Sequence, residues 1–183
     1  IDPIDGTRAF ITGVPVWGTL VGLMIGGRAV AGLMAQPFTR EVYLSLPGEA
    51  TYYRGEIRQP LRTSGVTELA KAKMTATSPD LFFRANRRDL RKQWEAVSGA
   101  ALTVRYGLDC YGYALVAAGH IDLVVEAALK DVDIAPLIPL IVNAGGVVTT
   151  WNNGPAEAGG NSVAAATPTL HAAALDLLAS ANG

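Results

Sequence analysis

Two carboxylates, Asp2 and Asp5, stand three positions apart at the start of the chain. Pro3 between them has no backbone N–H and stiffens the turn, so both side chains and the carbonyl of Ile4 can converge on one or two cations. Oxygen donors of this kind suit magnesium. The spacing therefore predicts a site for a hard metal ion in this turn.

A phosphate could bind beside these oxygens, because Gly6 and Thr7 follow directly and would offer backbone N–H groups where a helix begins. Asp133, far downstream, offers a third carboxylate. A simpler interpretation of the first motif is a tight turn with an Asx hydrogen bond and an N-cap. Asp133 likewise precedes an apolar helical stripe, where Asp is a common N-cap. The residues alone leave both interpretations open.

Composition excludes several classes of protein. Half of the 183 residues are hydrophobic, which allows a substantial core, and the net charge of −1 gives no basic field for nucleic acid. One small basic group is spaced like the solvated face of a helix and comprises Arg84, Arg87, Arg88, Arg91 and Lys92. No apolar run reaches the roughly 18 to 20 residues of a membrane span. The single Cys110 fits a reducing compartment. We therefore expect a cytoplasmic protein that binds neither nucleic acid nor membrane.

The first third of the chain has the pattern of an antiparallel meander. Apolar runs at 14–25 and 29–36 are joined through Gly26 and Gly27, as in a β-hairpin. Shorter strands are predicted at 41–46 and 50–54. We expect about four antiparallel strands here.

Strands and helices alternate in the remainder of the chain. Strands are predicted at 73–77, 102–106, 121–127, 147–151 and 163–166, and helices at 79–97, at 110–118, after Asp133 and at 168–179. The fold class is therefore α+β, a mixed α/β layered sandwich. We expect residues 1–183 to form a single compact unit, with the meander and a helix in 1–100 and a strand-helix half in 101–183.

The segment from Asp2 to Thr7 resembles the D-P-I-D-G-T signature of the inositol monophosphatase superfamily, in which a strand ends in this motif and a helix follows. Asp133 with the apolar helix behind it resembles the second signature, in which this Asp is a metal ligand. The chain departs from many relatives at Val132, where they have Trp, and at Pro136 and Pro139. The resemblance extends over nearly all 183 residues.

Two segments resemble the histidinol-phosphate phosphatase branch more closely. Lys130 to Pro139 is similar to its K-P-Y-D-I-A-A-L-I-P segment, and Gly107 to Tyr111 is similar to its G-x-D-C-Y element. A carboxylate at Asp109 suits a substrate with cationic amino and imidazole groups, although this residue could also cap a helix. Glu126 matches the position that contacts the non-phosphate part of the substrate, and Arg105 could shape the pocket.

The resemblance implies magnesium-dependent hydrolysis of a small phosphomonoester without a covalent intermediate. Asp2 would bridge two cations, with the carbonyl of Ile4 on one and with Asp5 and Asp133 on the other. Thr7 would orient the attacking water, and the amides of Gly6 and Thr7 would bind the phosphate. Asp2, Asp5 and Thr7 are thus the expected catalytic residues. We also expect a homodimer.

The chain begins without Met and inside the motif, so the N-terminal part of the family fold is expected to be missing. Relatives supply a further Glu ligand from a G-E-E-type loop upstream. We therefore expect these 183 residues alone to bind metal weakly and to hydrolyse little. Two alternatives stay open: a phosphatase for inositol or sugar phosphates, and an inactive fragment that keeps the fold. The sequence does not indicate a dinucleotide-binding module, since neither G-x-G-x-x-G nor G-x-x-x-x-G-K-[ST] occurs.

Overall fold

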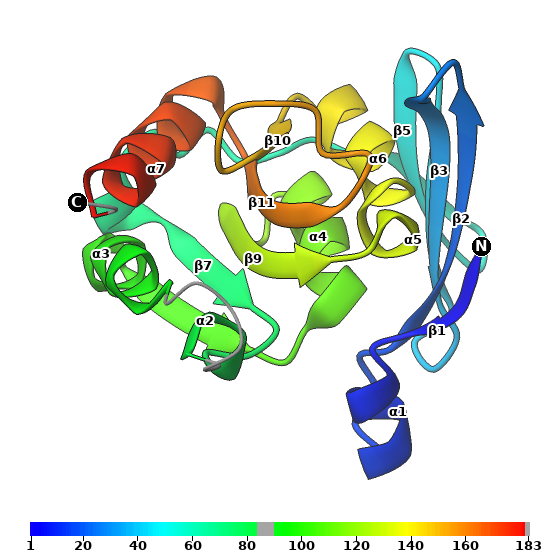
Figure 1. Cartoon of the computed structure of the whole chain (residues 1–183). Coiled ribbons are helices and arrows are strands. Elements are labelled where there is room, and N and C mark those ends of the chain that lie inside the picture. Colours follow the sequence, from blue (N-terminus) through cyan, green and yellow to red (C-terminus); the bar gives the residue numbers. More distant parts are fainter. Residues whose placement is uncertain (84–89, 182–183) are drawn as a thin grey trace.

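The computed structural model describes residues 1–83 and 90–181. The first third of the chain forms an antiparallel sheet with the strand order β1-β2-β3-β4-β5-β6 (Figure 1). The strands are β1 (Asp2–Asp5), β2 (Gly18–Ile25), β3 (Arg28–Gln36), β4 (Glu41–Leu46), β5 (Glu49–Arg54) and β6 (Ile57–Pro60). Helix α1 (Thr7–Thr12) lies between the first two strands in sequence. The predicted hairpin is confirmed, and both glycines of its turn, Gly26 and Gly27, have positive φ as a tight hairpin requires.

The second sheet is mixed and has the strand order β10-β11-β9-β7-β8. Its strands are β7 (Lys73–Ala76), β8 (Thr103–Tyr106), β9 (Leu123–Leu129), β10 (Val147–Thr150) and β11 (Gly160–Ala165). Strand β7 runs parallel to both β8 and β9, whereas β11 is antiparallel to β9 and β10. The carboxyl ends of the three parallel strands therefore share one edge, where α/β proteins commonly bind ligands.

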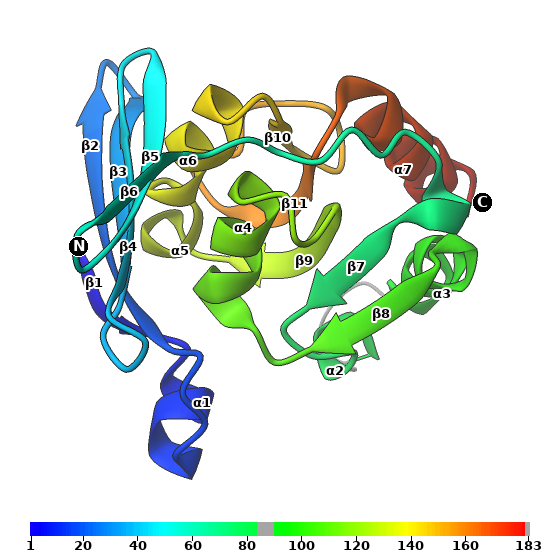
Figure 2. The ribbon, with the colours of Figure 1, turned by 180° about the vertical axis from the view of Figure 1, so that it is seen from behind.

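Helices form two further layers. α4 (Asp109–Ala117), α5 (Asp131–Ile134) and α6 (Leu137–Asn143) lie between the sheets, and α2 (Asp80–Phe83), α3 (Arg91–Ala100) and α7 (Pro168–Ser180) cover the far side of the second sheet, as Figure 2 shows from behind. A 3₁₀ turn at Leu69–Lys71 precedes β7. Each side of the second sheet has its own hydrophobic core. In the described part of the chain, no helix has the length and apolar character needed to cross a membrane.

Gly32 allows the first sheet to approach the middle helices closely. A Cβ at this position would lie 1.8 Å from the carbonyl oxygen of Pro136, which directly precedes α6. At Gly22 on the neighbouring strand, a Cβ would lie 3.2 Å from the ring of the same proline. Glycine at these two positions therefore allows strands β2 and β3 to lie close to the α5–α6 segment.

The predicted α+β layered sandwich is confirmed, with several corrections. The meander has six strands rather than four, because short edge strands form at β1, which contains Pro3, and at the exposed β6. The predicted division at residue 100 places strand 73–77 with the meander, but β7 pairs with β8 and β9. The stripe after Asp133 forms two helices instead of one. The first begins at Asp131, and the second begins at Leu137, directly after Pro136.

The predicted helix 79–97 includes positions outside the described residues. Its two ends are helical, in α2 and α3. Positions 84–89, which include three members of the predicted basic group, are not described, so the solvated helix face stays a prediction.

Candidate active site

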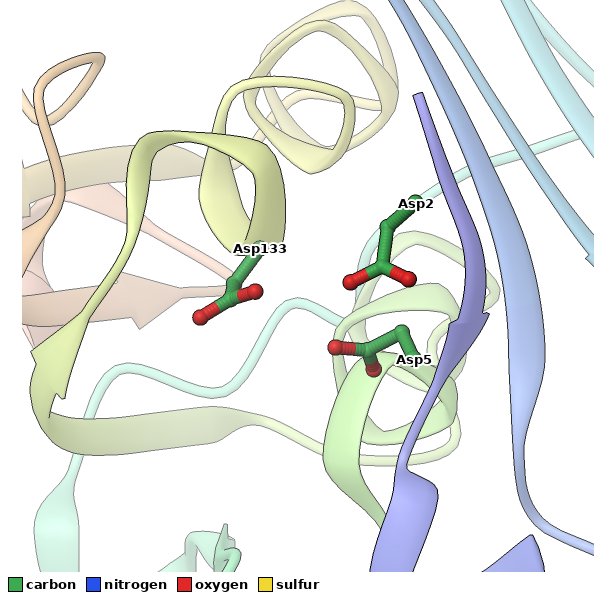
Figure 3. Close-up of side chains that lie close together, drawn as sticks. All are labelled: Asp2, Asp5 and Asp133. Carbon is green, nitrogen blue, oxygen red and sulfur yellow. The ribbon is translucent and has the colours of Figure 1, made fainter.

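Three carboxylates that are far apart in the sequence meet between the two sheets. Asp2 and Asp5 lie on β1, Asp133 lies on α5, and one oxygen of each lies within 4.8 Å of the others. Figure 3 shows the three side chains directed toward one another across the gap between these elements. The convergence of oxygens predicted from the sequence is therefore present in the fold.

The simpler interpretations of the two motifs hold only in part, since the Asx bond of the first motif is present but Gly6 is the N-cap of α1, without a side-chain capping bond. Oδ1 of Asp2 accepts a hydrogen bond from the Ile4 backbone N–H at 3.1 Å, which is an Asx-type bond. Oδ2 of Asp133 accepts from the Lys130 backbone N–H at 2.8 Å and so satisfies the start of α5. The predicted capping position needs correction, because Lys130 is the N-cap and Asp133 lies in the first turn. Each carboxylate keeps one oxygen without a role in these local bonds.

The Gly6-Thr7 step makes the turn from β1 into α1. Gly6 has φ +79°, in the left-handed region, and a Cβ there would lie 3.3 Å from Oδ2 of Asp109 and 3.2 Å from Cα of Trp17. The Thr7 hydroxyl donates to the Ile4 carbonyl at 3.2 Å. A carbonyl oxygen has two lone pairs, so this bond leaves the Ile4 oxygen able to accept a second partner.

Asp5 is held in an environment that resists its ionisation. Its Oδ2 accepts a hydrogen bond from the backbone N–H of Cys110 at 3.0 Å, which favours the charged form. Burial outweighs this bond, and with the nearby charges of Asp109 and Asp133 it raises the pKa of Asp5 to about 6. A bound cation would reverse this balance, because an opposite charge favours the carboxylate.

A cavity of about 160 Å³ opens beside these side chains. Four of the predicted acidic residues line it, namely Asp5, Asp109, Glu126 and Asp133. A second cavity of about 490 Å³ shares Arg8, Thr77, Leu81 and Asp109 with the first. The two cavities therefore adjoin, with Asp109 at their boundary.

Glu126 is buried at 1% exposure on the central strand β9, on the same face as Val124, which packs with the middle helices. Its Oε1 accepts a hydrogen bond from the Thr77 backbone N–H at 2.5 Å. Its Oε2 has no hydrogen-bond partner among the described residues. Burial raises the pKa of Glu126 to about 8, assisted by the charges of Asp109 and Asp5. This carboxyl group therefore has an unused oxygen at the cavity.

Asp109 opens helix α4 but does not cap it. The N-cap is Leu108, with no side-chain capping bond, and Asp109 itself has φ +45°. Burial raises the pKa of the Asp109 carboxyl, while hydrogen bonding from Thr77 and the charge of Arg8 oppose the rise. The helix-cap interpretation of Asp109 is therefore wrong, and the side chain lines both cavities.

The structure does not bring Arg105 to this site. It is an exposed residue of β8 whose carbonyl accepts from the Thr75 hydroxyl, and it lines neither cavity. Sequence reasoning missed Arg8 and Thr77, which line both cavities. Arg8 directly follows the first motif, and that position was the available signal. No signal in the sequence pointed to Thr77, because its place depends on how β7 pairs with its neighbours.

The donor set fits a hard divalent cation. Carboxylate oxygens gathered within 4.8 Å, with a turn carbonyl close by in sequence, are the ligands that magnesium and calcium prefer. Neither a thiolate nor an imidazole belongs to the group of three. Asp2, Asp5 and Asp133, with the carbonyl of Ile4, are the atoms that would hold such an ion.

Comparison with known proteins gives a consistent picture. A model of the inositol monophosphatase family matches residues 1–182. The chain is 37% identical over 187 residues to the chloroplastic bifunctional phosphatase IMPL2 of Arabidopsis thaliana, covering 97% of this chain and 52% of that protein. It is 32% identical over 146 residues to a histidinol-phosphatase of Chlorobaculum parvum, covering 80% and 54%.

The fold is also similar to that of a solved structure. An inositol monophosphatase from Zymomonas mobilis superposes with a TM-score of 0.89 at 34% identity, covering 97% of this chain and 68% of that one. The chain spans about half the length of the two curated relatives.

Proposed function

Because the chain belongs to the inositol monophosphatase family, we propose that it forms the metal and substrate side of a magnesium-dependent phosphomonoester hydrolase. The observation that carries this proposal is the approach of Asp2, Asp5 and Asp133 to within 4.8 Å at the edge of a cavity. Three carboxylates at this distance repel one another, and a divalent cation removes that repulsion.

Different residues of the site have different roles in the proposed hydrolysis. Asp2, Asp5, Asp133 and the Ile4 carbonyl hold the cations. Bound magnesium supplies charge that makes a water molecule more acidic and stabilises the leaving alkoxide. Thr7 orients the attacking water, and the backbone N–H groups of Gly6 and Thr7 bind the phosphate oxygens.

We propose histidinol phosphate as the substrate. After Asp2, Asp5 and Asp133 are neutralised by cations, the carboxyl groups of Asp109 and Glu126 still line the cavity. An amino or imidazolium group on the leaving alcohol would favour the ionised form of these carboxyl groups, and the unpartnered Oε2 of Glu126 is an acceptor for it. The relative from Chlorobaculum parvum, a histidinol-phosphatase, supports the same choice.

An inositol or sugar phosphatase is the second candidate. The three metal-binding carboxylates act on the phosphate and do not distinguish between leaving groups. The relative from Zymomonas mobilis, an inositol monophosphatase, has this fold. In this case Asp109 and Glu126 would accept hydrogen bonds from neutral hydroxyl groups.

The chain spans about half the length of its curated relatives, and this affects the activity that we propose for it. We propose that residues 1–183 fold as one unit, since α4 contacts strands of both sheets, and that they associate as a homodimer. We further propose that these residues alone bind magnesium weakly and turn over little substrate, because the family resemblance implies a further Glu ligand outside this segment. Turnover comparable to that of a full-length relative would refute this.

Exchange of Asp109 tests the substrate assignment. In a chain of full family length, Asp109→Ser should lower kcat/KM for histidinol phosphate by about 10- to 100-fold, since it removes a charge-assisted contact, and should change kcat/KM for inositol phosphate by less than about 3-fold. The matched control is Asp131→Ser, which removes an exposed carboxylate that does not line the cavity. Equal losses with both substrates would favour the second candidate.

A further inference from the structure

One buried carboxylate of the first sheet accepts hydrogen bonds from three hydroxyl groups. Glu41 begins β4 and is 9% exposed. Its Oε1 accepts from the Tyr52 hydroxyl at 2.9 Å, and its Oε2 accepts from the hydroxyls of Tyr111 at 2.7 Å and Thr39 at 2.6 Å. Burial opposes the ionisation of Glu41, but the three donors outweigh burial and lower the pKa of its carboxyl group. Glu41 is therefore held as a carboxylate whose two oxygens are both used by the protein.

The hydroxyl of Tyr111 links this carboxylate to another layer of the fold. Tyr52 and Thr39 belong to the first sheet and its turns, whereas Tyr111 lies in the first turn of α4, between the two sheets (Figure 2). The residue before it is Cys110, whose backbone N–H donates to Asp5 at 3.0 Å. The bond from Tyr111 therefore ties the start of α4 to β4, one residue away from the amide that holds Asp5.

A second branch of hydrogen bonds leads from Glu41 toward α1. The backbone N–H of Thr39 donates to Oε1 of Gln36 at 2.7 Å, and Nε2 of Gln36, a fully buried side chain, donates to the carbonyl of Pro15. Pro15 lies in the segment that returns from α1 to β2. Because α1 begins at Thr7, the helix starts that we assign to phosphate binding and to the leaving group are both connected to Glu41.

The first turn of α4 needs support from outside the helix. Asp109 has φ +45°, in the left-handed region, which is unfavourable for a residue other than glycine and persists only where the surrounding structure holds it. The helix has no side-chain cap of its own. Asp5 and Glu41 each accept a hydrogen bond from this turn, one from a backbone N–H and the other from a side-chain hydroxyl. Loss of either bond would allow the turn to relax and to move the Asp109 side chain that lines the cavity.

We propose that Glu41 is a positioning residue that acts through Tyr111. The bond between them holds the first turn of α4, and this turn presents the Cys110 amide to Asp5 and the Asp109 side chain to the cavity. The inference rests on the proposed function for the roles of Asp5 and Asp109 in hydrolysis. Glu41 itself lines neither cavity, so it would not touch the substrate.

Amide hydrogen exchange tests the positioning without ligand or metal. Tyr111→Phe keeps the ring and removes the hydroxyl. Measured by NMR, exchange at the Cys110 amide should rise about 10-fold more than exchange at the buried Val125 amide of β9, because one charge-assisted bond to the turn is lost while the core stays closed. An equal rise at both amides would mean a general loss of stability and would contradict the proposal.

The matched control is Tyr52→Phe. It removes another hydroxyl from the same carboxylate, but its bond joins neighbouring strands of the first sheet. The ratio of the Cys110 and Val125 exchange rates should therefore stay within about 2-fold of the parent value. A rise as large as that in Tyr111→Phe would show that the link through Tyr111 has no special role, and would also contradict the proposal.

A double-mutant cycle tests whether Tyr111 acts through Glu41. Glu41→Met keeps the length of the side chain and removes its acceptors. It should raise the exchange ratio at least as much as Tyr111→Phe does, and the double variant should exceed Glu41→Met by less than about 2-fold. Effects that multiply in full would mean that the two residues act independently, which would refute the proposal. If Glu41→Met does not fold, the comparison of Tyr111→Phe with Tyr52→Phe decides.

Magnesium dependence connects the positioning to the reaction. In a chain of full family length, Tyr111→Phe should raise the magnesium concentration for half-maximal hydrolysis of histidinol phosphate about 10-fold, as for other residues that orient a metal ligand without touching the ion. Tyr52→Phe should change it by less than about 2-fold. Equal shifts in the two variants would contradict the proposal. If the parent hydrolyses no phosphomonoester, the proposed function fails, and the exchange ratios still decide whether Glu41 holds the turn.

Discussion

The backbone N–H of Cys110 donates to Oδ2 of Asp5 at 3.0 Å and joins two positions that are 105 residues apart. The bond fixes the end of β1 against the first turn of α4, so the acidic turn of the first sheet is held to a helix that packs against the second. Asp5 therefore faces the cavity with one oxygen already used by the protein. Cys110 is 2% exposed and serves here through its backbone.

Removal of single carboxylates should distinguish those that bind the metal ion from those that do not. We expect Asp5→Asn and Asp133→Asn each to weaken magnesium binding at least about 10-fold, because each removes one charged oxygen from a three-carboxylate group. Asp131→Asn, in the same turn of α5 as Asp133, should bind as the parent does. Isothermal calorimetry in a chain of full family length measures all three. Unchanged affinity in both site variants would show that the cluster is not the metal site.

Metal binding should depend on pH through Asp5. Its pKa of about 6 means that below pH 6 a cation must displace a proton, whereas above pH 6 the carboxylate is already ionised. Affinity should fall about 10-fold for each unit below pH 6 and level off above it. Calorimetry in two buffers with different ionisation enthalpies would count the proton released. A constant affinity between pH 5 and pH 7, with no proton release, would contradict this.

Glu126 should make the free energy of unfolding depend on pH. Its pKa is about 8 in the fold, above its ordinary value of 4.5, so between these values the folded chain keeps a proton that the unfolded chain loses. Stability associated with this group is therefore greatest at low pH and falls as pH rises toward 8. Glu126→Gln removes the cost, and its stability relative to the parent should grow by roughly 2 to 4 kcal/mol from pH 5 to pH 8. Urea unfolding at both pH values measures it.

The exposed Glu95 on α3 provides the control for this comparison. Glu95→Gln should leave the pH dependence of unfolding as in the parent. A Glu126→Gln variant whose advantage does not grow between pH 5 and pH 8 would mean that the carboxyl group is ionised in the fold throughout that range.

Gly6→Ala should destabilise the chain more than Gly27→Ala does. Both glycines have nearly the same φ, +79° and +77°, so the cost of a left-handed alanine, about 1 to 2 kcal/mol, is common to both. Only at Gly6 does the new Cβ meet neighbours, at 3.2 Å from Trp17 and 3.3 Å from Asp109. We expect an additional loss of about 1 kcal/mol, measured by thermal or urea unfolding. Equal losses of stability in the two variants would mean that the turn at Gly6 accommodates the added Cβ without strain.

Much of the fold could be predicted from local pattern. The hairpin through Gly26 and Gly27 and helix α7 follow from turn residues and apolar periodicity, which depend only on neighbours in the chain. Local pattern did not predict strands β1 and β6, because one is four residues with a proline and the other is exposed and polar. Their pairing comes from the sheet and not from their own composition. Only the family resemblance implied a strand at the first motif.

The candidate site likewise contains residues that the sequence predicted and residues that it did not. The oxygen donors Asp2 and Asp5 and their turn could be predicted from spacing alone, since a proline and three positions of chain restrict where they point. Arg105 was assigned to the site by its closeness in sequence to Asp109, but it is an exposed residue that lines neither cavity. Thr77 lines both cavities because of strand pairing that no local pattern records, whereas the position of Arg8 directly after the first motif was a signal in the sequence.

The sequence by itself determined which groups are available for chemistry, the local turns that hold them and the alternation of sheets and helices, because each of these depends on residues a few positions apart. Only the tertiary structure decided that Asp133 meets Asp2 and Asp5, that Glu126 is buried with one oxygen unpartnered, and that Asp109 lines the cavity instead of capping its helix. The reason is physical: distance across the fold and removal from water depend on how distant elements pack together.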